Sequence, residues 1–368
     1  MRSQLKTPGE LRVWLLRDAL TLWWEKGADH AHGGFHDALG PDGNPILGNK
    51  RARVQARQIY VYATAGRLGW EGPWREAVEC GLSFFPSRFR RNDGLLRTVV
   101  STNGAPVDES AWLYDQAFAL LALAHAQRAI GSSRDLTCEA RELRDRLDGW
   151  RLESGGFREA SIAHPFQSNP HMHLFEACLA WIDVAPDSRW TRLAEEIVNL
   201  ALDRFIDANG ALREFFDGDW TPVPGPDGRI VEPGHQFEWA WLLERWSRRS
   251  GDDQAHCAAL RLYKRGCQGI DHDRGVVLQQ VLDDGTVRDA TSRLWPQTEW
   301  MKAAHIFGDT DGLARASNAL GLYLDRGVWG IWWDKLRPNG EFVDEPAPAS
   351  SFYHIVCALA EVSSSDCA

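Results

Sequence analysis

Apolar residues recur at helical spacing along most of the chain, in twelve separate segments. The first segment places Leu11, Trp14 and Leu15 on one side, and Thr7-Pro8 before it predicts an N-cap followed by a first-turn proline. The other predicted helices cover residues 55–69, 73–87, 109–129, 134–148, 170–185, 189–206, 234–250, 253–267, 294–307, 311–326 and 348–362.

The twelve segments alternate in character. Even-numbered segments are rich in small and apolar residues, as in DQAFALLALAHA at 115–126, whereas odd-numbered segments carry more charge, as in TCEARELRDRL at 137–147. A helix that is apolar on most sides is buried, and one with a polar side belongs to an outer layer. The pattern predicts an all-α fold, an (α/α)6 barrel of six inner and six outer helices, with residues 1–368 forming a single domain.

A turn of the form polar-Gly-apolar recurs at intervals of about 60 residues, which indicates an internal repeat. Each glycine precedes a few residues of extended, partly alternating character, so we expect short β-hairpin-like loops at one end of the barrel. The six repeat glycines are Gly34, Gly94, Gly156, Gly210, Gly275 and Gly330.

Polar residues that are unusual in apolar helices occur in every repeat, near the start of the predicted inner helix. In a barrel of parallel inner helices such positions meet at one mouth, which favours a functional site over scattered core polar groups. Taken singly, each residue also has a structural interpretation, such as a core histidine, a buried ion pair or aromatic packing. These residues are Arg57, Tyr114, Asp115, His171, His173, Glu176, His235, Glu238, Trp295, Gln297, Glu299 and His354.

The overall charge argues against nucleic acid as a partner, because 41 basic and 51 acidic residues leave a formal net charge of −10. The longest apolar stretch, 117–124, is too short to span a bilayer. The first residues lack the apolar core of a secretory signal. We therefore expect a cytoplasmic protein with no membrane association.

Seven cysteines are widely spaced and form no CxxC motif, which favours free thiols over disulfides or zinc sites. They are Cys80, Cys138, Cys178, Cys257, Cys267, Cys357 and Cys367. The 18 tryptophans are unusual for this length. Most should fill the core, but sugar rings stack on aromatic rings, so the excess mildly favours a carbohydrate site.

Six segments resemble, in order and spacing, the N-acylglucosamine 2-epimerase family of sugar 2-epimerases and aldose–ketose isomerases. They are RVQARQIYVYA, LYDQAFALL, NPHMHLFEA, PGHQFEWAWLL, RLWPQTEWMKAA and FYHIV. The resemblance implies an (α/α)6 barrel and chemistry through two histidines, with no metal and no cofactor. His235 and His354 then resemble the catalytic acid/base pair. The predicted substrate-binding residues are Arg57, His173, Glu176, Glu238, Trp295, Gln297 and Asp115.

Histidine suits this chemistry because its unperturbed pKa lies near neutrality, and Arg57 could stabilise an enediolate without a metal. We expect His354 to remove the C2 proton, and His235, held by Glu238, to open the sugar ring. The favoured reaction interconverts unphosphorylated D-mannose and D-fructose. A 2-epimerase acting on mannose or glucose, cellobiose or N-acylglucosamine uses the same intermediate. The expected partner is a monosaccharide, and the protein is expected to be a monomer or homodimer.

Other classes of function stay open at this point. A glycoside hydrolase needs two carboxylates, which Asp115, Glu176, Glu238 and Glu299 could supply. A metal-dependent isomerase could use the His and Glu residues, although two His-x-x-Glu pairs reverse the ligand order of di-metal bundles. A binding protein without activity is a further alternative. The histidines at equivalent inner-helix positions favour the isomerase.

Overall fold

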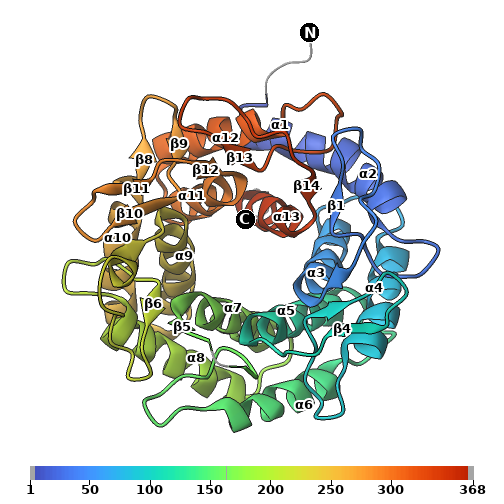
Figure 1. The fold of residues 1–368 in the computed structure, drawn as a ribbon, viewed down its shortest axis with the longest axis horizontal. Coiled ribbons are helices and arrows are strands. Elements are labelled where there is room, and N and C mark those ends of the chain that lie inside the picture. The colour runs from blue at the N-terminus through green and yellow to red at the C-terminus, as the bar shows by residue number, and fades with distance from the viewer. Residues whose placement is uncertain (1–4, 163, 364–368) are drawn as a thin grey trace. The chain divides into compact units, whose positions relative to one another are not determined.

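The computed structural model describes residues 5–162 and 164–363 (Figure 1). The chain forms two compact units. Unit 1 comprises Met1–Leu15, Val198–Ala347 and His354–Ala368, and unit 2 comprises Leu16–Ile197 and Pro348–Tyr353. Helix α13 (Ser350–Ser363) belongs to unit 2 in its first turn and to unit 1 in the remainder.

In unit 2, helices α3, α5 and α7 lie side by side, with α4 against α3 and α6 against α5 (Figure 1). The α-helices of this unit are α2 (Leu20–Leu22), α3 (Ala52–Arg67), α4 (Trp74–Phe89), α5 (Leu113–Ile130), α6 (Thr137–Leu147), α7 (Ser168–Val184) and most of α8 (Ser188–Leu200). Its strands are β1 (Ala38–Leu39), β2 (Lys50–Arg51), β3 (Val99–Val100), β4 (Pro106–Asp108) and β5 (Phe166–Gln167).

Unit 1 repeats this arrangement, with α9 against α11, α10 against α9 and α12 against α11. Its helices are α1 (Pro8–Trp14), α9 (Pro233–Ser250), α10 (Asp253–Cys267), α11 (Leu294–Ile306), α12 (Thr310–Leu324) and the larger part of α13. Its strands are β6 (Phe215–Phe216), β7 (Ile230–Val231), β8 (Ile270–Asp271), β9 (Val276–Val277), β10 (Gln280–Leu282), β11 (Val287–Asp289), β12 (Ser292–Arg293), β13 (Lys335–Leu336) and part of β14 (Ala347–Pro348).

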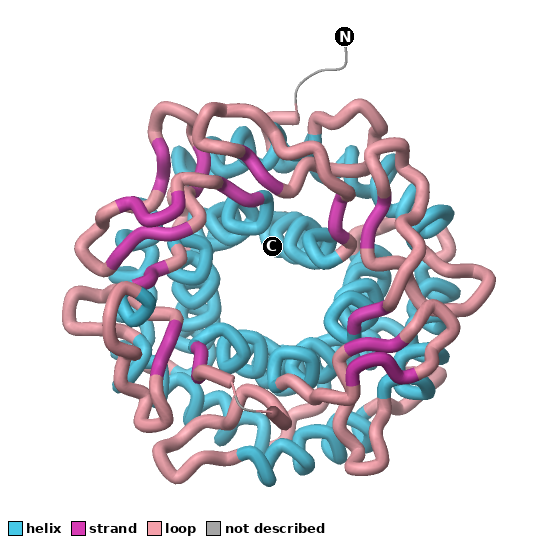
Figure 2. Tube along the Cα trace, in the orientation of Figure 1, coloured by secondary structure: helices cyan, strands magenta, loops and turns pink. Residues whose placement is uncertain are grey.

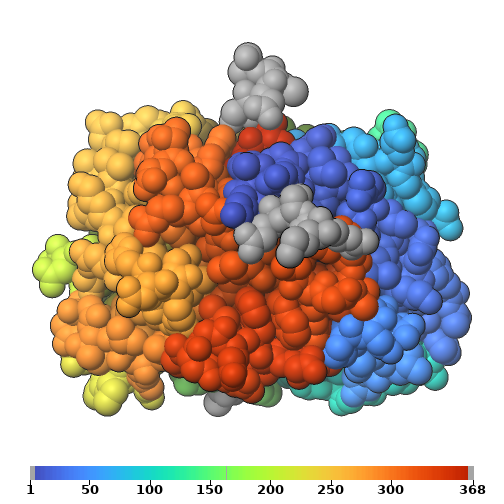
Figure 3. Space-filling view, turned by 90° about the horizontal axis from the view of Figure 1, so that it is seen from above, coloured from blue at the N-terminus to red at the C-terminus, as the bar shows by residue number. Residues whose placement is uncertain are grey.

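The predicted alternation of buried and amphipathic helices is present. Helices α5 and α7 bury residues on nearly every side, whereas α6 and α10 expose most of their polar residues. Helix α1 begins as predicted, with the Thr7 hydroxyl capping the Glu10 amide and Pro8 in the first turn. It packs against α12 on the face of unit 1 drawn in Figure 3.

Two further expectations concern the described part of the chain. Its six cysteines are free thiols, and Cys367 lies outside the described residues. Among the described helices, none is long and apolar enough to cross a membrane.

The strands are short and lie among the loops that connect the helices (Figure 2). Antiparallel pairs such as β3 with β4 and β10 with β11 are the predicted hairpin-like elements. All six repeat glycines have a positive φ, from 70° at Gly156 and Gly275 to 103° at Gly330. A side chain is disfavoured in this backbone region, which explains why glycine recurs at these turns.

A side-chain hydrogen bond, called a clasp below, joins each of five segments that follow a repeat glycine to the next α-helix in the chain. The contact is made by the fourth residue of the helix, which is a glutamine in four cases. Each glutamine side chain hydrogen-bonds the backbone at 2.8–3.4 Å. The backbone partner lies one residue after Gly34 and Gly156 and two residues after the repeat glycine in the other three cases. In the fifth case, His171 Nε2 accepts the amide of Phe157 at 3.0 Å. The pairs are Gln55 with Phe35, Gln116 with Leu96, His171 with Phe157, Gln236 with Leu212 and Gln297 with Val277.

The clasp fixes which way the rest of the helix faces. Two residues along an α-helix rotate a side chain by about 200°, so the residue two positions after a clasp points to the opposite side of its helix. Those residues are Arg57, Phe118, His173, Glu238 and Glu299. Four of these five are among the unusual polar residues that the sequence singles out.

Replacing a clasp glutamine should therefore destabilise the fold. In Gln116→Ala the buried amide and carbonyl of Leu96 lose their partner, so we expect the free energy of unfolding to fall by roughly 2 to 4 kcal/mol. Urea unfolding followed by circular dichroism measures this change. Gln254→Ala, at an exposed position of α10, is the matched control and should change little. Equal stability of the two variants would contradict a role for the clasp.

Candidate active site

His235 lies in the first turn of α9, where the clasp residue Gln236 anchors the helix start. Its Nδ1 lies 2.9 Å from a carboxylate oxygen of Glu214 and 3.5 Å from one of Glu232. The side chains of His235 and Glu214 are both more than 90% buried. Nδ1 is thus committed to carboxylates, and Nε2 is the nitrogen left for other chemistry.

The surrounding negative charge favours the protonated form of His235. Burial by itself would lower the pKa of His235, but the carboxylates of Glu214, Glu232 and Glu238 outweigh burial and raise this pKa to about 10. Burial raises the pKa of Glu232, although the positive charge of His235 acts to lower it. At neutral pH His235 therefore carries a proton on each nitrogen.

His354, on α13, has the same kind of partner. Its Nδ1 lies 2.8 Å from Oε1 of Glu299, a residue of α11 with no exposed side-chain surface. The Trp295 ring contacts both histidines, with centroid distances of 4.9 Å to His235 and 5.7 Å to His354. The two predicted acid/base residues therefore flank one indole ring within unit 1.

Carboxylates near His354 raise the question of a metal. One ligand atom from each of Glu238, Glu299 and His354 lies within 4.8 Å of the others, a spacing that a metal ion would accept. However, the Lys302 ammonium lies 2.5 Å from Glu299 Oε2, and both side chains are fully buried. This ammonium already neutralises the Glu299 carboxylate and repels a second cation, so the donor set fits a metal poorly.

In unit 2, Arg57 lies among aromatic rings. Its guanidinium is 4.1 Å from the Phe118 ring centroid and 5.3 Å from that of Tyr353, and it donates to the Tyr114 hydroxyl at 2.6 Å. It also donates to the Ser350 carbonyl at 3.2 Å. Cation–π contacts and hydrogen bonds hold this cation in place without a carboxylate partner among them.

The predicted pair His173 and Glu176 is present on α7, with Nδ1 of His173 3.3 Å from a Glu176 oxygen. The Tyr353 hydroxyl donates to the same carboxylate, at 2.6 Å from each oxygen. The His173 ring contacts the rings of Phe118 and Tyr114 at 4.4 and 5.1 Å. Arg57, His173 and Glu176 thus belong to one polar and aromatic cluster.

Two predicted substrate-binding residues have other contacts. Gln297 is a clasp residue whose amide also donates to Ser292 and to the Arg293 carbonyl. Asp115 is fully buried, and burial raises its pKa against the charges of Arg53 and Arg57. The contacts of Gln297 are those of a residue that holds a helix start.

The carboxylate that binds His235 is not the predicted one. The sequence predicts Glu238 as the partner of His235, but Nδ1 of His235 binds Glu214, and the charge of Glu238 raises the pKa of His235. A spacing of three residues places two side chains near one face, yet the first-turn position of His235 turns its ring toward the loop before the helix. Glu214 lies in that loop.

The sequence analysis did not predict four features of the candidate site: Glu214, Glu299 as the partner of His354, Lys302 and Tyr353. Lys302 could have been identified from the sequence, because it lies inside the apolar stretch WMKAA three residues after a glutamate, and a buried lysine usually has a charged partner. Glu214 is harder to identify from the sequence. Its loop is close to His235 only once the strand and helix are folded together.

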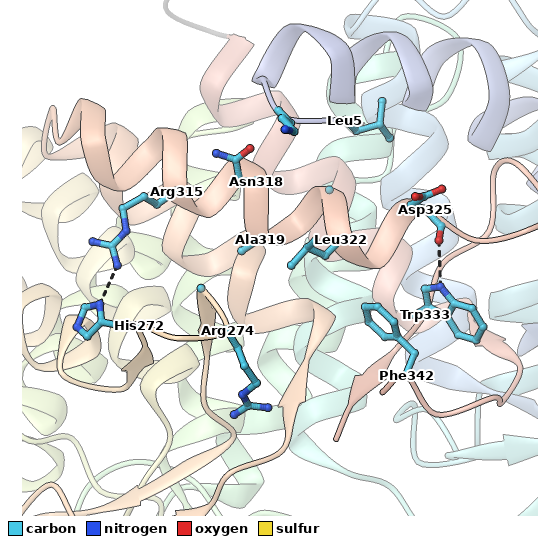
Figure 4. A pocket seen from close by; sticks show the side chains of 13 residues that line it. Leu5, His272, Arg274, Arg315, Asn318, Ala319, Leu322, Asp325, Trp333 and Phe342 are labelled. Atoms are coloured by element: carbon cyan, nitrogen blue, oxygen red, sulfur yellow. Dashed lines mark hydrogen bonds between the residues drawn. The ribbon is translucent and has the colours of Figure 1, made fainter. Parts of the chain in front are cut away.

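A separate cavity of about 500 Å³ lies on the outer side of α12 in unit 1 (Figure 4). Arg315 and His272 meet at one end of it, at 3.0 Å, and Trp333 and Phe342 stack at the other end. The Arg274 guanidinium between them donates to Asp271 and to two backbone carbonyls. This cation therefore holds the surrounding loops together.

Comparison with known proteins agrees with this fold. The N-acylglucosamine 2-epimerase family model matches residues 33–358. A mannose-6-phosphate isomerase of Rhizobium meliloti (strain 1021) is 47% identical, with 96% of each chain covered. A D-mannose isomerase of Thermobifida fusca is 28% identical over 89% of this chain and 88% of its own. The crystal structure of a D-mannose isomerase superposes with a TM-score of 0.88 at 20% identity, covering 99% of this chain and 100% of that chain.

These similarities confirm the predicted fold class, an (α/α)6 barrel. The chain belongs to the N-acylglucosamine 2-epimerase family. It is accordingly an enzyme of the sugar isomerase and epimerase class.

Replacing Glu214 should change how the rate depends on pH. In Glu214→Gln the carboxylate that raises the pKa of His235 most is lost, so this pKa should fall. If protonated His235 is required, the alkaline limb of the kcat profile should move to lower pH by about one unit or more. The control is Glu345→Gln, which removes the partly exposed partner of Lys335. An unmoved alkaline limb would argue against His235 as the acid.

A buried carboxyl group in unit 2 should make the folded protein less stable as the pH rises. Burial raises the pKa of Glu159 to about 8, against a hydrogen bond from the Gln167 amide. The folded state then holds a proton that the unfolded state has lost, so wild-type stability declines between about pH 5 and pH 8. Glu159→Gln should match the wild type near pH 5 and exceed its stability at pH 8, by on the order of 1 kcal/mol.

Thermal unfolding at both pH values measures this difference. Glu153→Gln, at an exposed position nearby, is the control and should follow the wild type at each pH. A constant offset between Glu159→Gln and the wild type would show that Glu159 keeps the same charge in both states.

Proposed function

We propose that the protein is an aldose–ketose isomerase that interconverts unphosphorylated D-mannose and D-fructose. One observation carries this proposal. Two buried histidines flank the ring of Trp295, and each has its Nδ1 on a carboxylate. A sugar isomerase needs a proton donor and a proton acceptor near one small substrate, and this pair can serve as both.

Ring opening is assigned to His235. Its raised pKa means that it is protonated at neutral pH, so Nε2 can donate a proton to the ring oxygen of the pyranose. The anomeric C1–O5 bond breaks as the C1 hydroxyl passes its proton to solvent and C1 becomes an aldehyde carbon. Glu214 and Glu232 stabilise the imidazolium before the transfer.

Proton transfer between C2 and C1 is assigned to His354. Glu299 accepts the hydrogen of Nδ1, so Nε2 presents its lone pair as the base. Nε2 removes the C2 proton, the C–H electrons form the C1–C2 double bond, and O1 takes up the negative charge. Return of the proton from Nε2 to C1, with transfer of the O2 proton to O1, gives the ketose.

The remaining assignments concern binding. We propose that Arg57, His173, Glu176 and Glu238 contact sugar hydroxyls and that Trp295 stacks on the sugar. A cation such as Arg57 can stabilise an enediolate without a metal. We propose metal-independent catalysis for this reason, and because Lys302 occupies the cationic position beside Glu299.

Two alternatives have specific support. The family also contains 2-epimerases, in which the proton would return to the opposite face of C2. The relative from Rhizobium meliloti is named for a phosphorylated sugar, so mannose 6-phosphate is the second candidate substrate. The glycoside hydrolase alternative is weaker, because Glu176 and Glu299 are already bound to Tyr353, His354 and Lys302.

The proposal is tested by incubating the enzyme in deuterium oxide with mannose, mannose 6-phosphate, glucose, cellobiose or N-acetylglucosamine, and following products by NMR. We expect fructose from mannose, with deuterium on C1 when solvent exchange competes with transfer. His354→Ala should lower the rate of C2 proton exchange by at least about 1000-fold. Full activity after treatment with EDTA is expected.

Several outcomes would revise the proposal. Faster turnover of mannose 6-phosphate would change the substrate, and glucose or glucosyl products without ketose would change the reaction to epimerisation. Retained C2 exchange in His354→Ala would remove this residue as the base. Loss of activity with EDTA, restored by one added metal, would overturn metal independence.

A further inference from the structure

We infer that Lys302 is a positioning residue that aligns His354 for proton transfer, acting through Glu299 and through Cys357. This inference rests on the proposed role of His354 as the base. Lys302 is assigned no contact with the sugar.

Lys302 is held on several sides within unit 1. Its ammonium lies 2.5 Å from Glu299 Oε2, 3.8 Å from the Trp241 ring centroid and 3.6 Å from the Cys357 sulfur. No part of its side chain is exposed. A buried ammonium is costly unless it is paired, so these contacts must be kept together in the folded protein.

The contacts of Lys302 converge on His354 by two routes. Glu299 uses Oε2 for Lys302 and Oε1 for Nδ1 of His354, so the ammonium fixes the rotation of the carboxylate that holds the imidazole. Cys357 follows His354 by three residues on α13 and therefore lies on a neighbouring part of the same helix face. The ammonium thus restrains both the ring and the turn that carries it.

Proton abstraction is sensitive to such restraint. Displacing a reacting group by about 1 Å can lower the rate 100-fold, while substrate affinity depends on other residues. Removal of Lys302 should therefore act on kcat more than on KM.

A purely structural ion pair would behave differently, and the chain contains one for comparison. Lys50 is also fully buried, and its ammonium lies 2.8 Å from Asp29 and close to the Gly33 and Thr102 carbonyls. None of these groups is assigned to catalysis. Lys50→Met is therefore a matched control for loss of a buried lysine.

The experiment compares Lys302→Met, Lys302→Arg and Lys50→Met with the wild type for kcat, KM and C2 deuterium exchange on the substrate that the wild type turns over. We expect Lys302→Met to lower kcat and C2 exchange by about 10- to 100-fold, with KM changed less than about threefold. Lys302→Arg should restore part of this loss, because its guanidinium can bind Glu299. Lys50→Met should lose stability but keep kcat, once folded enzyme is quantified.

A second variant covers the case in which Lys302→Met does not fold. Glu299→Gln/Lys302→Met removes both charges and leaves an amide that can still accept from His354. It should be slower than Glu299→Gln alone by less than about tenfold, because the route through Glu299 is already removed and only the Cys357 contact remains to be lost. A further loss of tenfold or more would show that Lys302 does not act through Glu299 and would overturn the inference.

The results also separate this inference from the proposed function. C2 exchange that survives in His354→Ala removes the base assignment itself. Exchange that is lost in His354→Ala but fast in folded Lys302→Met overturns only the role of Lys302. Equal losses of kcat in Lys302→Met and Lys50→Met would also overturn it, since they would reflect general destabilisation.

Discussion

The hydrogen bonds between a helix side chain and the backbone just after a repeat glycine are the constraint on which the rest of the structure depends. A loop leaves backbone groups that must find partners once they are buried. Gln55, Gln116, Gln236 and Gln297 supply both a donor and an acceptor, and His171 supplies an acceptor. For His171, burial lowers the pKa to about 4, so its Nε2 stays free of a proton and can accept.

The same constraint orients the candidate active-site residues. The clasp holds the fourth residue of a helix toward the segment that follows the repeat glycine. The residue two positions later therefore points to the opposite side of the helix. The chain places an arginine, a histidine and two glutamates there, at Arg57, His173, Glu238 and Glu299. Each of these polar groups is then buried, and their charges become strong because little water screens them.

The neighbouring charged groups differ between the two histidines. His235 meets several carboxylates, which raise its pKa and keep it protonated. His354 has Glu299, whose charge is shared with Lys302. In the proposed reaction these neighbours give His235 the acid role and His354 the base role. The proposed isomerisation uses this difference directly, since one residue must give a proton and the other must take one.

The sequence by itself determined the helices, their alternation, the six glycine turns and the helix positions of His235, His354, Arg57 and Glu176. These features follow from periodicity and from backbone preferences, which act between residues close in the chain. Tertiary structure alone decided that Glu214 rather than Glu238 binds His235, that Gln297 clasps Val277, and that Lys302 binds the partner of His354. Such contacts depend on side-chain directions and on segments brought together by folding, and no local pattern specifies them.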